Sequence, residues 1–420
     1  MTHLPAKRSM QIVILFGIFG LYFILLLETR SSIKSISNFI SDERTRNSDK
    51  IILVHYNDNI TSVNWRNLTK EQIDSLSELG KILYLGHDYP KLNASVKNYT
   101  ILTWNSQHGV QFFDDFDPLK SCPVKNCKIS YEDEDFEFAN MVVFDLRRME
   151  KVHELPKGKR NSKQIWTMLI DKATFNNLTQ IKNKLKNYNG IFNWTMSYRM
   201  DSEIPVPRGR TVPVKPGEPT EIESFDTWNK NKNQNVLIAI ADLNCNESDK
   251  HWKYVKELKK YIAVVIYGRC GDTKCLESST KDCSLLSQYK FYLAFEDSNC
   301  DEYLTEKLWL NTYAKNAVPI VMGATNKFYK QLLPPTSYIS TVDFSTPQDL
   351  AEYVLHLNNT PNELDSYFEW KKRFKVLNEF TEYLETDAIN YCRICEALNY
   401  NSMKKRVYND LETYWNKNYC

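Results

Sequence analysis

The stretch FYLAFEDSNCDEYLTEKLWLNTYAKNAVPIVMG, residues 291–323, joins two apolar runs through an acidic junction. The runs at 290–296 and 318–323 have the length of buried parallel strands, and YLTEKLWLNTYAKN at 303–316 has the length and composition of a helix. A strand, a helix and a second strand in this order indicate a parallel sheet. Ligands bind beyond the carboxyl ends of such strands, which is where the acidic junction falls.

The same rhythm continues on both sides of this stretch. Strands are predicted at 235–242 and 263–268, and helices at 251–262 and 346–357. Earlier apolar runs, which begin at 51, 81, 100, 141 and 164, are separated by polar or amphipathic segments such as 71–79. The five prolines in residues 205–219 exclude a helix or a central strand and indicate a linker. We therefore predict two doubly wound α/β domains with a ligand cleft between them.

The composition is that of an ordinary globular protein. Of 420 residues, 42% are hydrophobic and 25% are charged, with 54 basic against 52 acidic side chains. The net charge of +2 and the lack of a basic stripe with interleaved aromatics argue against nucleic acid as a partner.

An apolar segment at 12–27 follows Lys7 and Arg8. As a helix it would span roughly 24 Å, short for a bilayer but workable in a thin one. The alternative is a cleaved signal peptide, but the flank ETRSSIK has no small-residue cleavage pattern. We expect a membrane anchor with a cytosolic N-terminus, followed by a polar stem at 28–50.

Glycosylation sequons and cysteines agree with an exported body. The N-x-[ST] triplets lie at Asn59, Asn67, Asn93, Asn98, Asn177, Asn193, Asn246 and Asn358. The ten cysteines include a C-x4-C pair, Cys122 and Cys127, and a C-x2-C pair, Cys392 and Cys395. These four could hold zinc in the cytosol, whereas an oxidising lumen favours disulfides. The spacing alone leaves the connectivity open.

The acidic junction has two interpretations. A helix that begins near Tyr303 or Leu304 would turn its first amides toward the cleft and favour a phosphate, with Lys307 adding a full charge. Arg269 follows the strand AVVIYG, so two cations from adjacent turns could hold one diphosphate. Carboxylates nearby would bind sugar hydroxyls, which favours a nucleotide sugar. Alternatively, the acids only stabilise the helix dipole.

Three blocks resemble the α1,3-fucosyltransferase family. YKFYLAFEDSNCDEYLTEKLW is similar to the family motif FxFENSxxxDYxTEKLW, and FNWTMSYRMDSEIPVP at 192–207 is similar to FNWTxSYRxDSDIxxPYG. YVKELKKYIAVVIYGRCG at 254–271 resembles the stretch before the donor site. The resemblance covers roughly residues 165–400.

The resemblance implies a GT-B fold and inverting transfer of L-fucose from GDP-fucose, in α1,3 linkage, to N-acetylglucosamine of a glycoprotein N-glycan or related glycan. It implies a single-pass type II Golgi membrane protein with a lumenal catalytic part, and disulfides that join the Cys122 and Cys127 cluster to the Cys392 and Cys395 cluster. The donor-binding positions that it implies are Arg269, Asp297, Tyr303, Glu306 and Lys307, with Tyr198 and Arg199 beside the cleft.

The chain departs from the family in places. Asp297 replaces an asparagine, and PRG at 207–209 replaces PYG. The family's catalytic glutamate has no clean match, so we take Asp171 as the candidate base, with Glu203 and Asp201 next. The substitutions keep two alternatives open: a catalytically weakened glycan-binding paralogue, and a transferase that uses another nucleotide sugar.

No H-x-x-x-H or D-x-D motif occurs in the donor half, so we expect no metal site and at most stimulation by Mn²⁺ or Mg²⁺. The expected organisation is a cytosolic tail (1–11), anchor (12–27), stem (28–50), acceptor-side domain (51–204), linker (205–225), donor-binding domain (226–375) and a C-terminal segment returning to the first domain (376–420).

Overall fold

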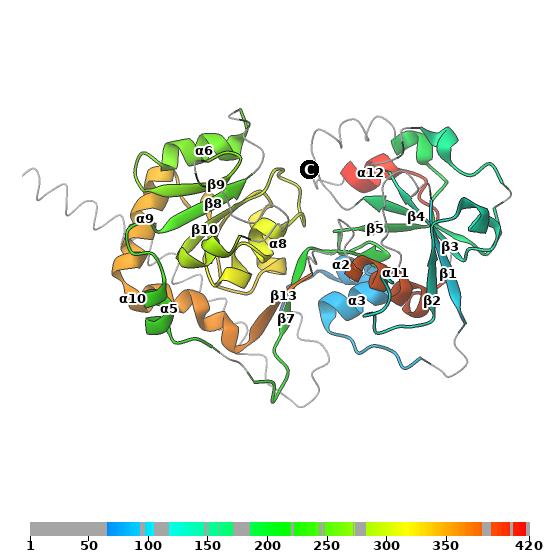
Figure 1. The fold of residues 1–420 in the computed structure, drawn as a ribbon, viewed down its shortest axis with the longest axis horizontal. Helices are drawn as coiled ribbons and strands as arrows, with labels where there is room; N and C mark the ends of the chain where they lie inside the picture. The colour runs from blue at the N-terminus through cyan, green and yellow to red at the C-terminus, as the bar shows by residue number, and fades with distance from the viewer. Residues whose placement is uncertain are drawn as a thin grey trace, which may run out of the picture.

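The computed structural model describes residues 65–92, 97–104, 117–146, 149, 151–158, 160–170, 185–219, 222–242, 246, 248–271, 273, 283–379, 388–403 and 406–416. The predicted anchor and stem lie outside these ranges. Among the described residues, no helix is long and apolar enough to cross a membrane. Two α/β units stand side by side, with the second unit on the left of Figure 1 and the first on the right.

The first unit is built on a six-stranded parallel sheet with the order β2-β1-β3-β4-β5-β6. Its strands are β1 (Tyr99–Thr103), β2 (Cys127–Ser130), β3 (Met141–Asp145), β4 (Ile165–Ile170), β5 (Trp194–Ser197) and β6 (Ile204–Pro205). Its helices are α2 (Lys70–Ser75), α3 (Glu78–Leu85), α11 (Ala388–Tyr400) and α12 (Leu411–Asn416). All residues of β3 and β5 are buried, as in a parallel sheet covered on both faces.

The second unit has a five-stranded parallel sheet with the order β12-β11-β10-β8-β9. Its strands are β8 (Ile238–Asp242), β9 (Val264–Gly268), β10 (Phe291–Phe295), β11 (Val318–Met322) and β12 (Ile339–Ser340). Its helices are α5 (Phe225–Asn231), α6 (Lys250–Leu258), α7 (Glu306–Trp309), α8 (Asn326–Leu332), α9 (Pro347–Asn359) and α10 (Pro361–Asp365). Short 3₁₀ turns occur in both units, at Asp133–Glu137, Val152–Glu154, Lys186–Tyr188, Ser284–Gln288, Tyr313–Lys315, Thr341–Asp343 and Ser366–Lys372. The prediction of parallel α/β layers is confirmed.

A two-stranded antiparallel ribbon lies between the units (Figure 1). It pairs β7 (Gly209–Pro213) with β13 (Phe374–Asn378). The proline-rich stretch that we predicted as a linker therefore includes a strand, but one in an isolated ribbon where prolines at the ends interrupt no central ladder. A Cβ on Gly209 would lie 2.4 Å from the Trp309 ring, so the ribbon packs closely against α7.

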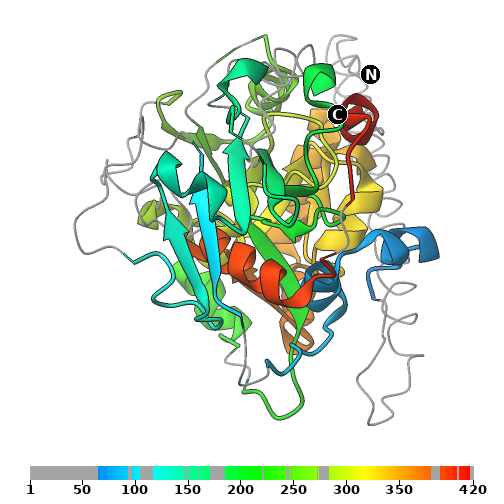
Figure 2. The same cartoon turned by 90° about the vertical axis from the view of Figure 1, so that its right-hand side faces the viewer.

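The C-terminal segment returns to the first unit. Helix α11, red-orange in Figure 2, packs against α3 and β6. The two predicted clusters are joined by the disulfides Cys122–Cys392 and Cys127–Cys395, with chain separations of 270 and 268 residues. These bridges fasten the end of the chain to the β2 edge of the first sheet.

One apolar run lies in a helix, and one predicted helix is shorter than expected. The run KILYLG at 81–86 belongs mostly to helix α3, because the Ser77 side chain caps its start and Gly86 ends it in the left-handed conformation with φ of 73°. The helix predicted at 303–316 is only the four-residue α7, followed by a 3₁₀ turn that ends at Asn316 with φ of 52°. A run of four apolar residues does not distinguish a strand from a buried helix turn.

Candidate functional site

The carboxyl edge of the second sheet gathers charged side chains. β8 ends at Asp242, and Glu296 and Asp297 directly follow β10. β8 and β10 are neighbours in the sheet, although β9 lies between them in the chain. This is a topological switch point, where open parallel sheets form their ligand crevices.

Lys307 lies in the middle of this edge. Its Nζ donates hydrogen bonds to Asp297 Oδ1 at 2.7 Å, to Asp242 Oδ2 at 3.0 Å and to the Phe295 carbonyl oxygen at 3.1 Å. Burial disfavours its charge, but Asp242 and Asp297 raise the pKa of Lys307 above the ordinary lysine value. Lys307 is therefore a permanently charged group held between two carboxylates.

Glu296 fixes the loop that carries these groups. It is buried, and its two carboxylate oxygens accept hydrogen bonds from the Thr305 N–H and hydroxyl, both at 2.8 Å. Burial raises the pKa of Glu296 to about 8, although Lys307 and Thr305 oppose the shift. Gly323 has φ of 143°, and a Cβ there would lie 2.9 Å from the Glu296 Cβ, so glycine is needed for this close approach.

The predicted helix N-terminus offers fewer free amides to an anion than expected. α7 begins at Glu306, later than expected, and the Thr305 N–H already bonds to Glu296. The Lys307 N–H bonds to the Thr305 hydroxyl at 3.3 Å. Because these two donors are satisfied inside the loop, we expect side-chain cations to contribute most to anion binding at this edge.

Arg269 is the second cation of this edge. It follows Gly268, which lies opposite Asp242 in the β8–β9 register, and its side chain is exposed. Gly268 has φ of 89°, and a Cβ there would lie 2.6 Å from the Asp242 carbonyl oxygen. The turn after β9 therefore passes close over the end of β8 and carries Arg269 to the same edge as Lys307.

The carboxyl edges of the two sheets face each other. Glu302, with φ of 62°, reaches from the loop after β10 and accepts a 2.6 Å hydrogen bond from the Met200 N–H, in the loop after β5. The ring of Tyr303 meets that of Tyr198 edge-on, with centroids 5.1 Å apart. The two predicted tyrosines thus join the units beside the switch point. Burial raises the pKa of Glu302 to about 8.

Arg199, predicted beside the cleft, is instead a fully buried structural side chain. Its guanidinium donates to both carboxylate oxygens of Asp201, at 2.8 and 2.6 Å, and to the Tyr414 carbonyl, and it stacks on the Tyr414 ring. These contacts engage all three guanidinium nitrogens within the protein. The reason is that the C-terminal α12, far away in sequence, closes over this segment.

The three candidate bases differ in their surroundings, and one of them lies outside the described residues. Asp171 follows the last residue of β4 but lies outside the described residues. Asp201 is held by Arg199. Glu203 is buried and accepts bonds from the Thr195 N–H at 2.7 Å and the Tyr408 hydroxyl at 2.8 Å, and its burial raises its pKa. Glu306, predicted to bind a donor, begins α7 and is half-buried.

Among the predicted glycosylation sites, Asn67, Asn98 and Asn246 are exposed, whereas Asn59, Asn93 and Asn177 lie outside the described residues. Asn358 is partly buried and accepts a 2.7 Å hydrogen bond from Lys290. The structure contradicts Asn193, which is 3% exposed and whose amide nitrogen donates to the Arg406 carbonyl at 3.1 Å. A glycan has no room at that position.

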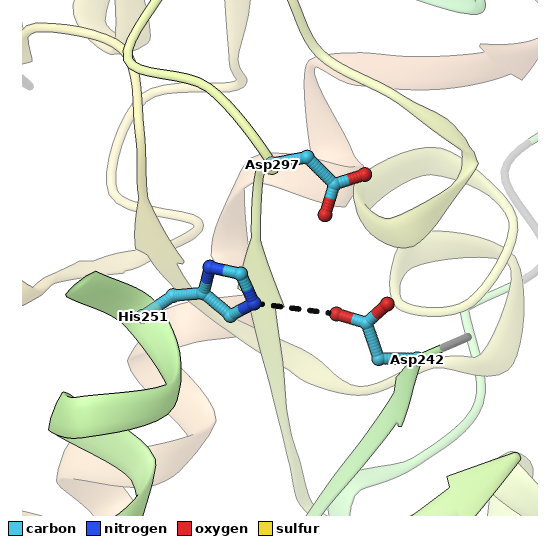
Figure 3. A group of neighbouring side chains, drawn as sticks. All are labelled: Asp242, His251 and Asp297. Atoms are coloured by element: carbon cyan, nitrogen blue, oxygen red, sulfur yellow. Dashed lines mark ion pairs between the residues drawn. The ribbon is translucent and has the colours of Figure 1, made fainter. Parts of the chain in front are cut away.

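Two residues of this edge were not predicted from the sequence. Asp242 and His251 lie beside Asp297, and one ligand atom from each of the three falls within 4.8 Å of the others (Figure 3). The three come from the end of β8, the first turn of α6 and the loop after β10. No short motif connects them, so only the known strand order could have brought them together.

The fold and this edge define a class: a two-domain α/β protein with a charged ligand site at a sheet switch point. Two family models match the chain. Residues 96–209 match "Fucosyltransferase, N-terminal", and residues 229–415 match "Glycosyltransferase family 10 (fucosyltransferase) C-term". The chain belongs to glycosyltransferase family 10, the fucosyltransferases.

Curated relatives agree with this assignment. A glycoprotein 3-alpha-L-fucosyltransferase A from Drosophila melanogaster is 33% identical, over 80% of this chain and 64% of that protein. A 3-galactosyl-N-acetylglucosaminide 4-alpha-L-fucosyltransferase from Bos taurus is 34% identical, over 65% and 70%. An alpha-(1,3)-fucosyltransferase 7 from Rattus norvegicus is 31% identical, over 70% and 72%.

Among solved structures, a crystal structure of an alpha1,3-fucosyltransferase with GDP-fucose is similar at a TM-score of 0.44. It is 13% identical, and the match covers 80% of this chain and 98% of that one.

Proposed function

We propose that this protein transfers L-fucose from GDP-fucose, in α1,3 linkage, to N-acetylglucosamine of a glycoprotein N-glycan or a related glycan. The observation that carries the proposal is the Lys307 cluster at the β8–β10 switch point, inside the segment that matches the family's fucosyltransferase model. The names of the relatives support both the sugar and the linkage.

Lys307 and Arg269 would hold the donor diphosphate. Asp242 is 4% exposed and remains a buried partner of Lys307, whereas Asp297 is 39% exposed and can be replaced by a phosphate oxygen. The exchange keeps the Lys307 ammonium paired throughout, which makes it feasible in a partly dry site. Arg269, exposed at the neighbouring turn, adds the second charge.

The chemistry is a displacement with inversion. The acceptor hydroxyl oxygen attacks the anomeric carbon, the bond from that carbon to the diphosphate oxygen breaks, and its electron pair leaves with GDP. Lys307 and Arg269 stabilise the negative charge that develops on the diphosphate. The hydroxyl proton passes to a carboxylate base, for which we propose Asp171.

We propose a lumenal location, which the state of the cysteines supports. All described cysteines are disulfide-bonded, which is typical of an oxidising compartment. With the apolar segment at 12–27 and the exposed sequons, this supports a single-pass type II Golgi membrane protein.

One observation favours a second candidate, a glycan-binding paralogue of weakened activity. Asp297 replaces the motif's asparagine and ties Lys307 in a 2.7 Å ion pair that a neutral amide would not form. The diphosphate must displace this carboxylate, which weakens donor binding relative to a chain with asparagine.

The test is a panel of nucleotide sugars and defined glycan acceptors, with turnover and acceptor binding measured separately. We expect turnover with GDP-fucose and with an acceptor carrying N-acetylglucosamine. Acceptor binding without turnover would favour the paralogue, and turnover with a different nucleotide sugar would reject GDP-fucose as the donor. Asp297→Asn should tighten GDP binding in the proposed enzyme.

A further inference from the structure

We propose that Asp242, His251 and Asp297 form a binding site for a divalent transition-metal cation at the end of β8. The carboxylates of Asp242 and Asp297 and the imidazole of His251 would be its three protein ligands. The cation site itself stands on geometry alone, whereas its coupling to a nucleotide, argued below, rests on the proposed function.

The three ligand atoms are already close together. All lie within 4.8 Å of one another, so a cation at their centre would need only small side-chain movements to reach each of them. Figure 3 shows the His251 ring and the Asp242 carboxylate facing each other, with Asp297 above them. They are held on three separate elements, so the arrangement is fixed by the fold and not by one flexible loop.

His251 distinguishes this site from an ordinary cluster of acidic side chains. Its side chain is 5% exposed, and its Nε2 has no hydrogen-bond partner among the described residues. Asp242 Oδ2 lies 3.5 Å from this nitrogen, too far for a good hydrogen bond. A buried polar atom without a partner requires an explanation, and an imidazole nitrogen that faces one carboxylate and lies close to a second is a common type of metal ligand.

Lys307 occupies the position of the cation in this structure. Its ammonium bridges Asp242 and Asp297, so one positive charge faces two negative charges. A divalent cation would balance the two carboxylates fully and would also satisfy His251, which the ammonium does not. Metal binding would displace Lys307 from this position toward the open side of the crevice.

The ligand set selects the type of metal. One imidazole and two carboxylates suit Mn²⁺ or Zn²⁺ better than Ca²⁺ or Mg²⁺, which prefer oxygen ligands only. Three protein ligands leave positions open for water or phosphate oxygens. Because the cation and the displaced Lys307 both add positive charge beside the proposed diphosphate position, metal and GDP should each tighten the other's binding by the same factor.

The experiment is a titration of the full-length protein with Mn²⁺, first without nucleotide. Electron paramagnetic resonance measures the concentration of free Mn²⁺ at each step. We expect one saturable site per chain. His251→Phe should weaken binding at least about tenfold. His356→Phe is the matched control, since His356 lies on α9 and pairs with Glu363 instead. The Mn²⁺ affinity of the His356→Phe protein should equal that of the parent.

A variant that gains Mn²⁺ affinity tests the proposal without the ambiguity of misfolding, because a misfolded protein would not bind the ion more tightly. Lys307→Met removes the competing ammonium and keeps all three ligands, so it should bind Mn²⁺ more tightly than the parent, and Zn²⁺ should displace Mn²⁺ from it. The absence of a saturable site in both proteins, or equal affinities in His251→Phe and the parent, would overturn the proposal.

Repeating the titration with GDP separates the two proposals. The GDP–Mn²⁺ complex formed in protein-free solution must be subtracted. Tighter Mn²⁺ binding with GDP supports a cation beside the donor site. An unchanged affinity would retain the cation site but overturn its coupling to the nucleotide.

Discussion

Replacing Lys307 with methionine tests whether the charge cluster is organised as described. The change removes the ammonium and leaves Asp242 buried without its cation. Removing one partner of a buried ion pair typically costs about 3–5 kcal/mol. Lys307 is 11% exposed and Asp297, at 39%, can turn to solvent, so we expect the lower end, about 3 kcal/mol.

For a domain of this size, a loss of about 3 kcal/mol lowers the melting temperature by roughly 6–12 °C. Scanning calorimetry of the parent and the variant, without added metal, measures the shift. Lys260→Met is the matched control because its pair with Glu257 is exposed, and we expect it to change stability by less than about 0.5 kcal/mol.

A second substitution distinguishes the effect of the unpaired Asp242 charge from other effects that lower the melting temperature. Asp242→Asn in the Lys307→Met background neutralises the buried charge and should recover at least half of the lost stability. An unchanged melting temperature for Lys307→Met, or a further loss on adding Asp242→Asn, would contradict the account. In the same variants, GDP binding measured by titration calorimetry should weaken by about 1.5–3 kcal/mol, the scale of a charged hydrogen bond.

Four further predictions concern other parts of the chain. The pKa of Glu302 rises from 4.5 to about 8 on folding, so its contribution to stability is complete below about pH 4.5 and is lost as the pH rises through 8. The melting temperature of Glu302→Gln should therefore rise relative to that of the parent between pH 5 and 8. A constant difference between the two melting temperatures over this range would refute the raised pKa of Glu302. Removing the Cys127–Cys395 bridge by a double alanine substitution should cost about 2–5 kcal/mol in denaturant unfolding, and no change in midpoint would show that the bridge does not constrain the unfolded chain. Asp171→Ala should lower turnover at least about 100-fold with GDP affinity unchanged, and turnover at the parent rate would exclude it as the base. Glycopeptide mapping should find a glycan on exposed Asn246, and an unmodified asparagine in protein from a secretory cell would contradict the lumenal assignment.

The strands of the second sheet could be predicted from the sequence because they are buried on both faces. Val264–Gly268, Phe291–Phe295 and Val318–Met322 each fall inside a continuous apolar run bounded by polar or glycine residues. Their carboxyl ends carry Arg269 and Asp297, so the edge that holds the site was also predictable.

Three features of the site could not be predicted because they depend on tertiary contacts. The helix predicted at 303–316 begins only at Glu306 because Glu296, nine residues before Thr305, binds the Thr305 N–H and hydroxyl. The family resemblance placed Arg199 beside the cleft, but it could not show the C-terminal segment that buries this side chain from more than 200 residues away. His251 lies on a helix face with no local sign of a ligand, and only the β8–β10 pairing brings it beside Asp297.

The most direct test of the account is a structure of the protein with GDP bound. We predict the diphosphate at the β8–β10 edge, with its oxygens within about 3.2 Å of Lys307 Nζ and with Asp297 displaced from that lysine. A diphosphate bound elsewhere, or one at this edge that leaves the Lys307–Asp297 pair intact, would contradict the assignment of Lys307 as the donor-binding cation.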